Sequence, residues 1–230
     1  MKVLIIEPAN QLQLNDKARP NGTLGPAYIL GSLKRNGIEA DYLDATVGQV
    51  GRNLKETFYL RSEMENGNIR YGLSIEFLSE IISNYDVVAT SSIFTVQTRM
   101  HFEVANVAKK VAAQRGKKIL TVSGGVNARA LREHFLSNNF DIVALSEGEE
   151  TIKEIISKIL DGEYSKTPIE GAYIKKNNKI LKGPPRNRVR CLKGMAWPAW
   201  EFFNVNIMLD NGIGNTSNQI AGVRPMPLNA

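Results

Sequence analysis

Five short apolar runs, separated by helical patterns, constrain the fold of this chain most. They lie at Lys2–Glu7, Glu39–Leu43, Asp86–Ala89, Ile119–Val122 and Asp141–Leu145. Runs of this length suit β-strands, and the helical patterns between them suit the crossovers that join parallel strands. The alternation predicts a doubly wound α/β fold with a five-stranded parallel sheet over residues 1–162. Because such crossovers are right-handed, the flavodoxin-like strand order 2-1-3-4-5 is favoured.

The run at Ile119–Val122 leads into two glycines and then a helical pattern. Gly124 and Gly125 have no Cβ atom, so they let a flat ligand approach the backbone and permit φ values that other residues avoid. Val126 suits a hydrophobic staple before Asn127, a candidate N-cap, which predicts that a helix begins there. An ordinary tight turn between strand and helix would explain the same glycines.

The other helices have sequence signals at their ends. Pro26 suits the first turn of a helix that ends at Gly37. Ser74 is a candidate N-cap, and apolar spacing predicts a long helix over about 96–114. The segment Ser146–Glu149 matches a capping box in front of the last helix, which Gly162 ends.

Two polar segments interrupt this pattern. Residues 8–23 are predicted to form a long loop, of a length that is often functional. Residues 46–71 are predicted to form a crossover insertion, in which Leu54, Phe58 and Leu60–Arg61 suggest a helix and Asn66–Asn68 a turn.

The chain beyond residue 162 differs in composition. Gly171–Ile174 and Lys179–Leu181 are predicted to pair as a small hairpin, and a proline-containing extended connector follows. The predicted organisation is an α/β domain at 1–162, a basic hairpin and linker at 163–195, and a connector at 196–230. Trp197, Trp200 and Phe202–Phe203 are interpreted as an anchor between domains.

The positive charge is local. The segment Lys175–Lys193 holds eight basic residues and no acidic one, whereas the net charge of the 230-residue chain is +6, so the rest carries −2. A charged hairpin is usually a solvated face, and without stacking aromatics a nucleic-acid contact is not expected.

Composition also bears on the cellular compartment. The single cysteine, Cys191, excludes a disulfide framework and fits a reducing cytoplasm. No segment approaches the roughly 18 consecutive apolar residues of a membrane span. The apolar run at the N-terminus is short for a signal peptide. A cytoplasmic protein without a membrane span is therefore expected.

Small or hydroxyl-bearing residues follow three successive predicted strands, at the sheet edge where ligands bind in open α/β folds. They are Ser91, Ser92 and Thr95, then Ser123, Gly124 and Gly125, then Ser146, Glu147 and Gly148. Such an edge leaves room for a large flat ligand. Capping and tight turns explain each group singly, but they explain three successive groups less well.

Several common sites are not supported. The glycines after the first strand do not have the G-x-G-x-x-G spacing of a dinucleotide site, and the P-loop pattern is absent. His101 and His134 are interpreted as helix residues, since neither has a partner at metal-ligand spacing. No Ser-His-Asp or Cys-His arrangement is suggested. The chain alone is therefore interpreted as a binding module and not as a complete catalyst, and no catalytic or metal-ligating residue is assigned.

Taken in order, these motifs resemble the N-terminal cobalamin-binding domain of cobalamin-dependent radical SAM proteins. The resemblance covers essentially the whole chain. It rests on LGPAYILGSLKRNGIEADYLDA, TSSIFT, SGGVN, SEGEE, PPR and WPAWEFF. It implies that cobalamin is the cofactor of this chain and that ten residues bind it: Ser91, Ser92, Thr95, Ser123, Gly124, Gly125, Val126, Glu147, Gly148 and Glu149.

Two departures from related patterns refine this expectation. Cobalamin domains that supply an axial histidine carry D-x-H-x-x-G after the first strand, but residues 8–23 contain no histidine. A base-off cobalamin without histidine on cobalt is therefore expected, as the radical SAM branch implies. The family also needs C-x-x-x-C-x-x-C for an iron–sulfur cluster that cleaves S-adenosylmethionine, and this chain has one cysteine.

We therefore expect the cluster and S-adenosylmethionine to belong to a radical SAM barrel, in the same protein or in a split partner. The resemblance implies methyl transfer to an unreactive carbon or phosphorus of an unknown substrate, or related radical chemistry. Two competing hypotheses remain. One is an α/β enzyme with a nucleotide or flavin cofactor, and the other is an interaction domain that has lost its ligand.

Overall fold

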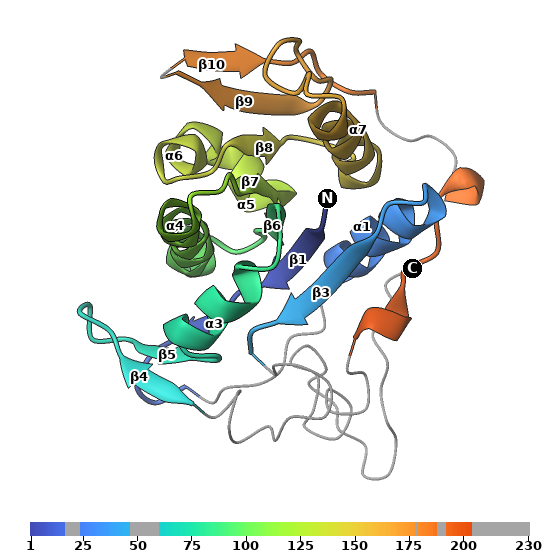
Figure 1. Cartoon of the computed structure of the whole chain (residues 1–230). Helices are drawn as coiled ribbons and strands as arrows, with labels where there is room; N and C mark the ends of the chain where they lie inside the picture. The colour runs from blue at the N-terminus through green and yellow to red at the C-terminus, as the bar shows by residue number, and fades with distance from the viewer. Residues whose placement is uncertain (17–23, 47–59, 178, 188–191, 204–230) are drawn as a thin grey trace, which may run out of the picture.

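The computed structural model describes the chain in five stretches, residues 1–16, 24–46, 60–177, 179–187 and 192–203. Its centre is a seven-stranded sheet with the order β10-β9-β8-β7-β6-β1-β3 (Figure 1). Five strands are parallel: β1 (Val3–Glu7), β3 (Ala40–Asp44), β6 (Val87–Ser91), β7 (Leu120–Gly124) and β8 (Ile142–Ala144). The predicted α/β fold and its strand order are confirmed.

Helices cover both faces of the sheet because successive strand residues point to opposite sides. Val3 and Ile5 of β1 belong to one apolar cluster, with helices α1 (Leu24–Arg35) and α7 (Gly148–Leu160). Leu4 and Ile6 belong to the opposite cluster, with α3 (Ile75–Ile82) and α4 (Thr98–Arg115). The two helices α5 (Gly125–Ala130) and α6 (Arg132–Ser137) complete that second face around Phe135.

The predicted hairpin extends the same sheet. Strand β9 (Ala172–Lys176) pairs antiparallel with β8 and with β10 (Lys179–Lys182). Ile174 and Ala172 are fully buried in the cluster that α1 and α7 share with the sheet. The hairpin therefore contributes to the main core.

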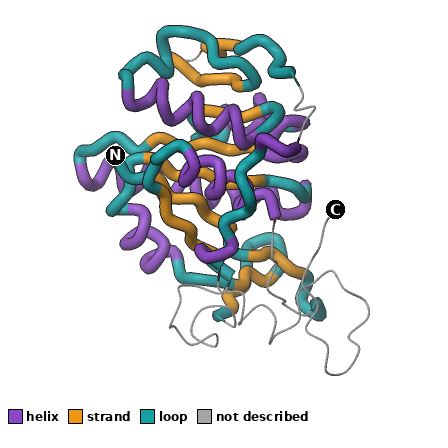
Figure 2. Tube along the Cα trace, turned by 90° about the vertical axis from the view of Figure 1, so that its right-hand side faces the viewer, coloured by secondary structure: helices purple, strands orange, loops and turns teal. Residues whose placement is uncertain are grey.

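A second, three-stranded sheet was not predicted. It consists of β2 (Asn10–Leu12), β5 (Ile69–Tyr71) and β4 (Arg61–Glu63), and Figures 1 and 2 show it below the main sheet. The predicted loop at 8–23 thus contains a strand, and Arg61, predicted as helical, is in β4. The predicted turn at 66–68 is confirmed, since the Asn66 side chain accepts a bond from the Asn68 amide at 3.2 Å.

Polar contacts hold the small sheet to the main domain. The Arg70 guanidinium donates to both oxygens of Glu103 on α4, at 2.7–2.9 Å. The Gln11 amide N–H donates to Gln97 Oε1 at 2.9 Å, and Gln97 Nε2 donates to the Gln11 carbonyl at 2.9 Å. The side-chain amide of Gln97 therefore pairs with β2 as another strand would.

Two helix starts differ from the prediction. Helix α5 begins at Gly125 instead of Asn127, because the Asn127 side chain bonds Ser92 and Thr98 and does not cap the helix. The predicted capping box is wrong, since α7 begins after Glu147, whose side chain makes no capping bond. The predicted N-cap Ser74 is confirmed, and so is the end of α4 at Gly116, whose φ is +60°.

The connector packs against α1. The Ala199 amide donates to the Ala27 carbonyl at 2.9 Å, and a Cβ atom on Gly31 would lie 2.1 Å from the Trp197 carbonyl oxygen. Phe203 is buried, with its ring centroid 4.2 Å from that of Tyr42. Of the predicted anchor residues, Trp197 is the exception, because it is 86% exposed.

Some predicted features lie outside the described residues. They are Cys191, Leu54, Phe58, residues 17–23 of the predicted loop at 8–23, and the connector beyond 203. Among the helices of the described ranges, none combines the length and apolar character needed to cross a membrane.

Candidate functional site

A cavity of about 280 Å³ lies at the carboxyl ends of β1, β6, β7 and β8. It is on the sheet face that α1 and α7 cover, and the first turns of both helices line it. Eight of the ten predicted binding residues line this cavity: Ser91, Ser123, Gly124, Gly125, Val126, Glu147, Gly148 and Glu149. Ser92 and Thr95 do not.

The floor of the cavity is apolar and small. Ala89 and Ala144 contribute methyl groups from β6 and β8, and Ile5 and Val122 lie on the strands between or beside them. Successive strand residues point to opposite faces of the sheet. The small residues at these strand tips face the cavity, and larger side chains of the same strands face the opposite core. A flat apolar group can therefore reach the sheet itself.

Glycines shape the entrance. A Cβ atom on Gly125, whose φ is +89°, would lie 2.3 Å from the Ser92 carbonyl oxygen. A Cβ atom on Gly148 would lie 2.9 Å from Ile29 Cδ1. Gly124 is different, because a Cβ atom there would meet Ala144 Cβ at an ordinary 3.5 Å. Gly125 therefore lets two loops touch, whereas Gly124 keeps space open within the cavity.

Ser92 and Thr95 lie outside the cavity lining and bond Asn127 of α5. The Asn127 side-chain amide donates to Ser92 Oγ and Thr98 Oγ1, both at 2.8 Å, and its oxygen accepts from Thr95 Oγ1 at 3.1 Å. The backbone N–H of Asn127 also donates to the Ser92 carbonyl at 3.1 Å. This buried network fixes the loop after β6 against α5.

Hydroxyl and charged groups surround the apolar floor. Ser91 and Ser146 line the opening, whereas the buried hydroxyls of Thr90 and Ser123 lie 3.3 Å apart and bond each other. Among the described lining residues, Arg129 carries the single positive charge, opposed by Glu147 and Glu149. These surfaces suit an aromatic group with polar and anionic substituents.

Sequence reasoning missed the part of the site that does not follow a strand directly. Gly25, Pro26 and Ile29 line the cavity from α1, and Arg129 does so from α5. The signal for α1 was present, because a helix that follows β1 starts at the same edge of the sheet. No local pattern distinguished Arg129 from other exposed helical residues.

The histidines lie away from the cavity lining. His101 is buried on α4, and burial lowers its pKa from 6.5 to about 3, so the ring is neutral at physiological pH. His134 is exposed on α6, where its ring packs edge-on against Phe102. In the part of the chain that the structure describes, no three His, Cys, Asp or Glu residues gather as a metal site.

Comparison with protein-family models matches residues 20–156 to the B12 binding domain. The curated protein cytidylyl-2-hydroxyethylphosphonate methyltransferase of Streptomyces wedmorensis is 26% identical over 89% of this chain. The chain spans 41% of the length of that relative.

Solved structures share the fold. The radical S-adenosylmethionine methyltransferase TsrM from Kitasatospora setae, with cobalamin and a [4Fe-4S] cluster bound, aligns over 86% of this chain and 31% of its own, with a TM-score of 0.57 and 16% identity. The cobalamin-dependent S-adenosylmethionine radical enzyme OxsB, with aqua-cobalamin bound, aligns over 81% of this chain and 22% of its own, with a TM-score of 0.59 and 14% identity.

Proposed function

Because this chain belongs to the B12-binding domain family, we propose that its cavity holds the nucleotide tail of a base-off cobalamin for methyl transfer or related radical chemistry. The carrying observation is the cavity itself, an apolar floor at the strand tips that Gly124 leaves open. The benzimidazole base of cobalamin is flat and apolar, so it matches the floor made by Ala89, Val122 and Ala144.

The residues around the floor suit the rest of the tail. The hydroxyl of Ser91, which lies on the same face of β6 as Ala89, can hydrogen-bond the ribose, and the Arg129 guanidinium can pair with the phosphodiester. The bound cofactor would supply a cobalt atom that carries a methyl group. The chain's own contribution is to bind the tail, orient the corrin and keep water from the buried base.

The cobalt is proposed to have no histidine ligand from this domain. Residues 8–23, which follow β1, contain no histidine. The first part of this segment forms β2, which pairs with β5 in the small sheet. His101 is buried behind the sheet and His134 is exposed on α6. The base, removed from cobalt, would then occupy the cavity.

Exposed apolar residues beside the cavity suit a large cofactor. Phe94 is 61% exposed and Val96 72% exposed, in the loop that Asn127 ties to α5, and Val126 is exposed at the cavity edge. Isolated exposed apolar residues are common, but adjacent ones mark interaction surfaces. We propose that the corrin edge covers them.

The proposed reaction needs a second domain. The chain spans 41% of its curated relative, and an iron–sulfur cluster needs cysteines that the 230 residues do not supply. We propose a radical SAM barrel, in the same protein or as a separate partner, as the source of the cluster and S-adenosylmethionine. The proposed location is the cytoplasm.

The test is retention of cobalamin by the purified chain. The protein is mixed with hydroxocobalamin, desalted, and examined by visible absorption. Retained corrin with a base-off spectrum is expected. A spectrum of imidazole-ligated cobalt would disprove the histidine-free state, and no retention, with thermal stabilisation by FMN or a nicotinamide nucleotide, would favour the alternative α/β enzyme.

A matched pair of variants separates binding from folding. Gly124→Val fills the cavity, while its Cβ meets Ala144 at a normal distance, so it should fold but lose at least tenfold in cobalamin affinity. Gly194→Val makes the same change in an open surface turn, where a Cβ atom meets nothing within 4 Å, and should bind as the unmodified chain does. Equal binding by both variants would place the cofactor elsewhere.

A further inference from the structure

The turn between β8 and α7, Ser146–Gly148, forms one side of the cavity and contains a strained residue. Glu147 has φ 37° and ψ 67°, in the left-handed region that residues other than glycine seldom adopt. Such a conformation persists only where its surroundings determine it. The Glu147 side chain makes no capping bond to α7, so the support must come from other residues.

Thr151 supplies that support from one turn into α7. It is fully buried, and its hydroxyl donates to the Ser146 carbonyl at 2.8 Å. Its backbone amide donates to the Glu147 carbonyl at 3.0 Å. The two bonds fix the carbonyls of the peptides before and after Glu147, and so restrict the φ and ψ angles of that residue.

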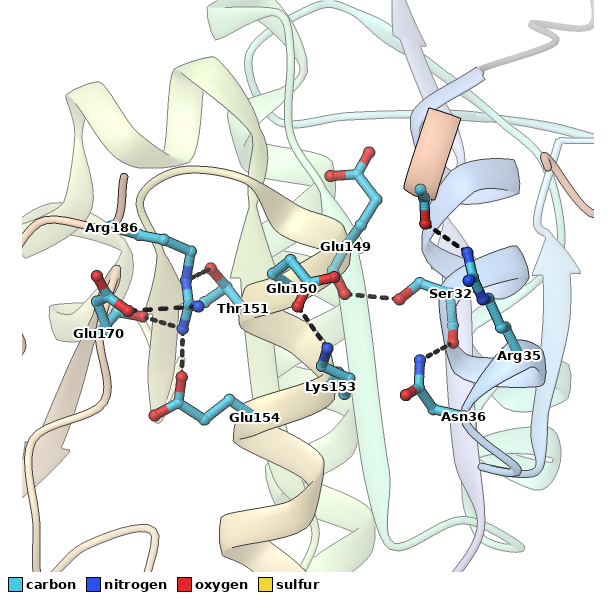
Figure 3. Close-up of polar contacts among 11 residues, drawn as sticks. Ser32, Arg35, Asn36, Glu149, Glu150, Thr151, Lys153, Glu154, Glu170 and Arg186 are labelled. Carbon is cyan, nitrogen blue, oxygen red and sulfur yellow. Dashed lines mark hydrogen bonds and ion pairs between the residues drawn. The ribbon is translucent and has the colours of Figure 1, made fainter. Parts of the chain in front are cut away.

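Arg186 holds Thr151 in turn, from the segment that follows the hairpin. Its Nε donates to Thr151 Oγ1 at 3.1 Å, and Nη2 donates to the Glu170 carbonyl at 2.9 Å and pairs with the Glu154 carboxylate (Figure 3). Nη1 lies 3.5 Å from Glu170 Oε2. The Arg186 side chain is 14% exposed, so it is not part of the solvated basic face that the sequence suggested.

Close packing leaves this network little freedom. Gly171 has φ +72°, and a Cβ atom there would lie 3.1 Å from both Arg186 Cβ and Thr151 Oγ1, and 3.3 Å from Ser146 Oγ. The Leu145 amide donates to the Gly171 carbonyl, and the Gly171 amide donates to the Pro184 carbonyl, both at 2.7 Å. The turn is thus bonded to the segment that carries Arg186 by backbone as well as by side chain.

We propose that Arg186 is a positioning residue of the cofactor cavity. Through Thr151 it keeps the Ser146–Gly148 turn in the shape that receives the tail, which makes the chain after the hairpin a part of the site. This inference rests on the proposed function. Only arginine suits the role, because its planar guanidinium contacts a hydroxyl, a carbonyl and two carboxylates at once. A lysine has one ammonium group and cannot reach all four.

The experiment compares four variants of the full chain. Thr151→Val removes the hydroxyl at nearly constant volume, Thr151→Ser keeps it, and Arg186→Lys keeps the charge but loses the fork. Arg70→Lys is the matched control, because Arg70 makes an equally buried fork with Glu103 outside the cavity lining. Hydroxocobalamin affinity is measured by equilibrium dialysis, and amide hydrogen exchange at residues 145–149 is measured without cofactor.

Thr151→Val and Arg186→Lys should bind hydroxocobalamin about tenfold more weakly and exchange faster at 145–149, as expected for the loss of one hydrogen bond to a charged group. Thr151→Ser, which keeps the hydroxyl, should have the hydroxocobalamin affinity and the exchange rates of the unmodified chain. Arg70→Lys should lower the melting temperature and leave both unchanged. Unchanged affinity and exchange in Thr151→Val and Arg186→Lys would overturn the inference. If the unmodified chain binds no cobalamin, the proposed function fails, and the exchange rates still decide what Arg186 holds.

Discussion

Gly125 joins β7 to α5 at a place where no side chain fits. Its φ is +89°, and an added Cβ atom would lie 2.3 Å from the Ser92 carbonyl oxygen and 2.9 Å from the Ser92 carbonyl carbon. Those are backbone atoms, so no side-chain rotation can relieve the contact. We expect Gly125→Ala to lower the free energy of unfolding by about 2–4 kcal/mol, from backbone strain and from the displaced loop. Urea denaturation measures the change.

Gly116→Ala is the matched control for this prediction. Gly116 also has a positive φ, +60°, but a Cβ atom there would meet nothing within 4 Å. Gly116→Ala should lower the free energy of unfolding by about 1 kcal/mol, from the left-handed conformation alone. Equal losses in the two variants would show that the contact with Ser92 has no energetic weight.

His101 should make the stability of the fold depend on pH. Burial lowers the pKa of this histidine to about 3 from 6.5, and among the described residues its Nδ1 atom has no hydrogen-bond partner. Between these values the unfolded chain binds a proton that the folded chain does not. Stability therefore rises with pH from about 3 to 6.5, by at most about 1.4 kcal/mol per pH unit from this group.

An apolar variant tests that contribution. His101→Leu should reduce the loss of stability between pH 7 and pH 5, because it removes the proton that the unfolded chain would take up. Urea midpoints at the two pH values give the comparison. A loss as large as that of the unmodified chain would assign the effect to other groups.

The polar residues at the strand tips were predictable as a set, but their individual directions were not. Period-two alternation and the strand order place Ser91, Ser123 and the two glycines at one edge, which is where the structure has them. Ser92 and Thr95 lie outside the cavity lining because they bond Asn127, more than thirty residues later in the chain. A contact between distant loops leaves no local pattern.

At the scale of elements, α1 and the connector approach each other more closely than any side chain allows. Gly31 lies under the Trp197 carbonyl oxygen, and the Arg35 guanidinium donates to the Gly194 carbonyl beside it. In an exposed helix, Gly→Ala adds about 1 kcal/mol of stability through helix propensity. Here we expect the opposite sign, because the added Cβ atom displaces the connector.

Gly31→Ala should therefore destabilise the chain and speed proteolysis between residues 192 and 203. Limited digestion with chymotrypsin, followed by mass spectrometry, detects the cut after Trp200 or Phe202, since Pro198 blocks cleavage after Trp197. Lys34→Ala, on the same helix, removes the exposed ion pair with Glu201 without crowding the connector, so it should digest nearly as slowly as the unmodified chain. A gain of stability in Gly31→Ala would mean that the connector is held elsewhere.

The small sheet shows why some elements escaped prediction. Its strands are short and largely polar, with Asn10 and Gln11 in β2 and three exposed residues in β4. They lack the alternation of a half-buried strand, and their pairing joins segments about sixty residues apart. The capping box at Ser146–Glu149 failed for a related reason, since Thr151 and not Glu149 bonds the turn.

At the scale of the whole molecule, the hairpin and the α/β part share one core. Ile169, Ala172 and Ile174 are fully buried against the cluster that holds α1 and α7. Fully burying an isoleucine contributes about 2 kcal/mol, so removal of two would cancel much of the stability of an ordinary domain. We therefore expect the α/β part and the hairpin to unfold as one cooperative unit across the predicted boundary at residue 162.

A chain that ends at Gly162 should consequently fail to fold or should aggregate, because it also uncovers the edge of β8. Circular dichroism and size-exclusion chromatography, beside the full chain, give the answer. Ile174→Ala in the full chain is the milder companion variant, expected to cost about 2–5 kcal/mol. A monomeric, cooperatively melting 1–162 chain would contradict this view.

The overall topology was predictable because few arrangements satisfy five buried strands with right-handed crossovers. The attachment of the hairpin was not, since its sequence indicates a pair of strands without saying which edge they join. That edge is decided by the fit of Ile174 against the core.

The position of β10 has a consequence for solubility. It is the outermost strand of the main sheet, and its unpaired backbone groups could recruit another molecule edge to edge. Lys179 and Lys182 stand at its two ends, and both are exposed. Two copies that met along this strand would bring like charges together, so we expect the lysines to oppose edge-to-edge association of the chain.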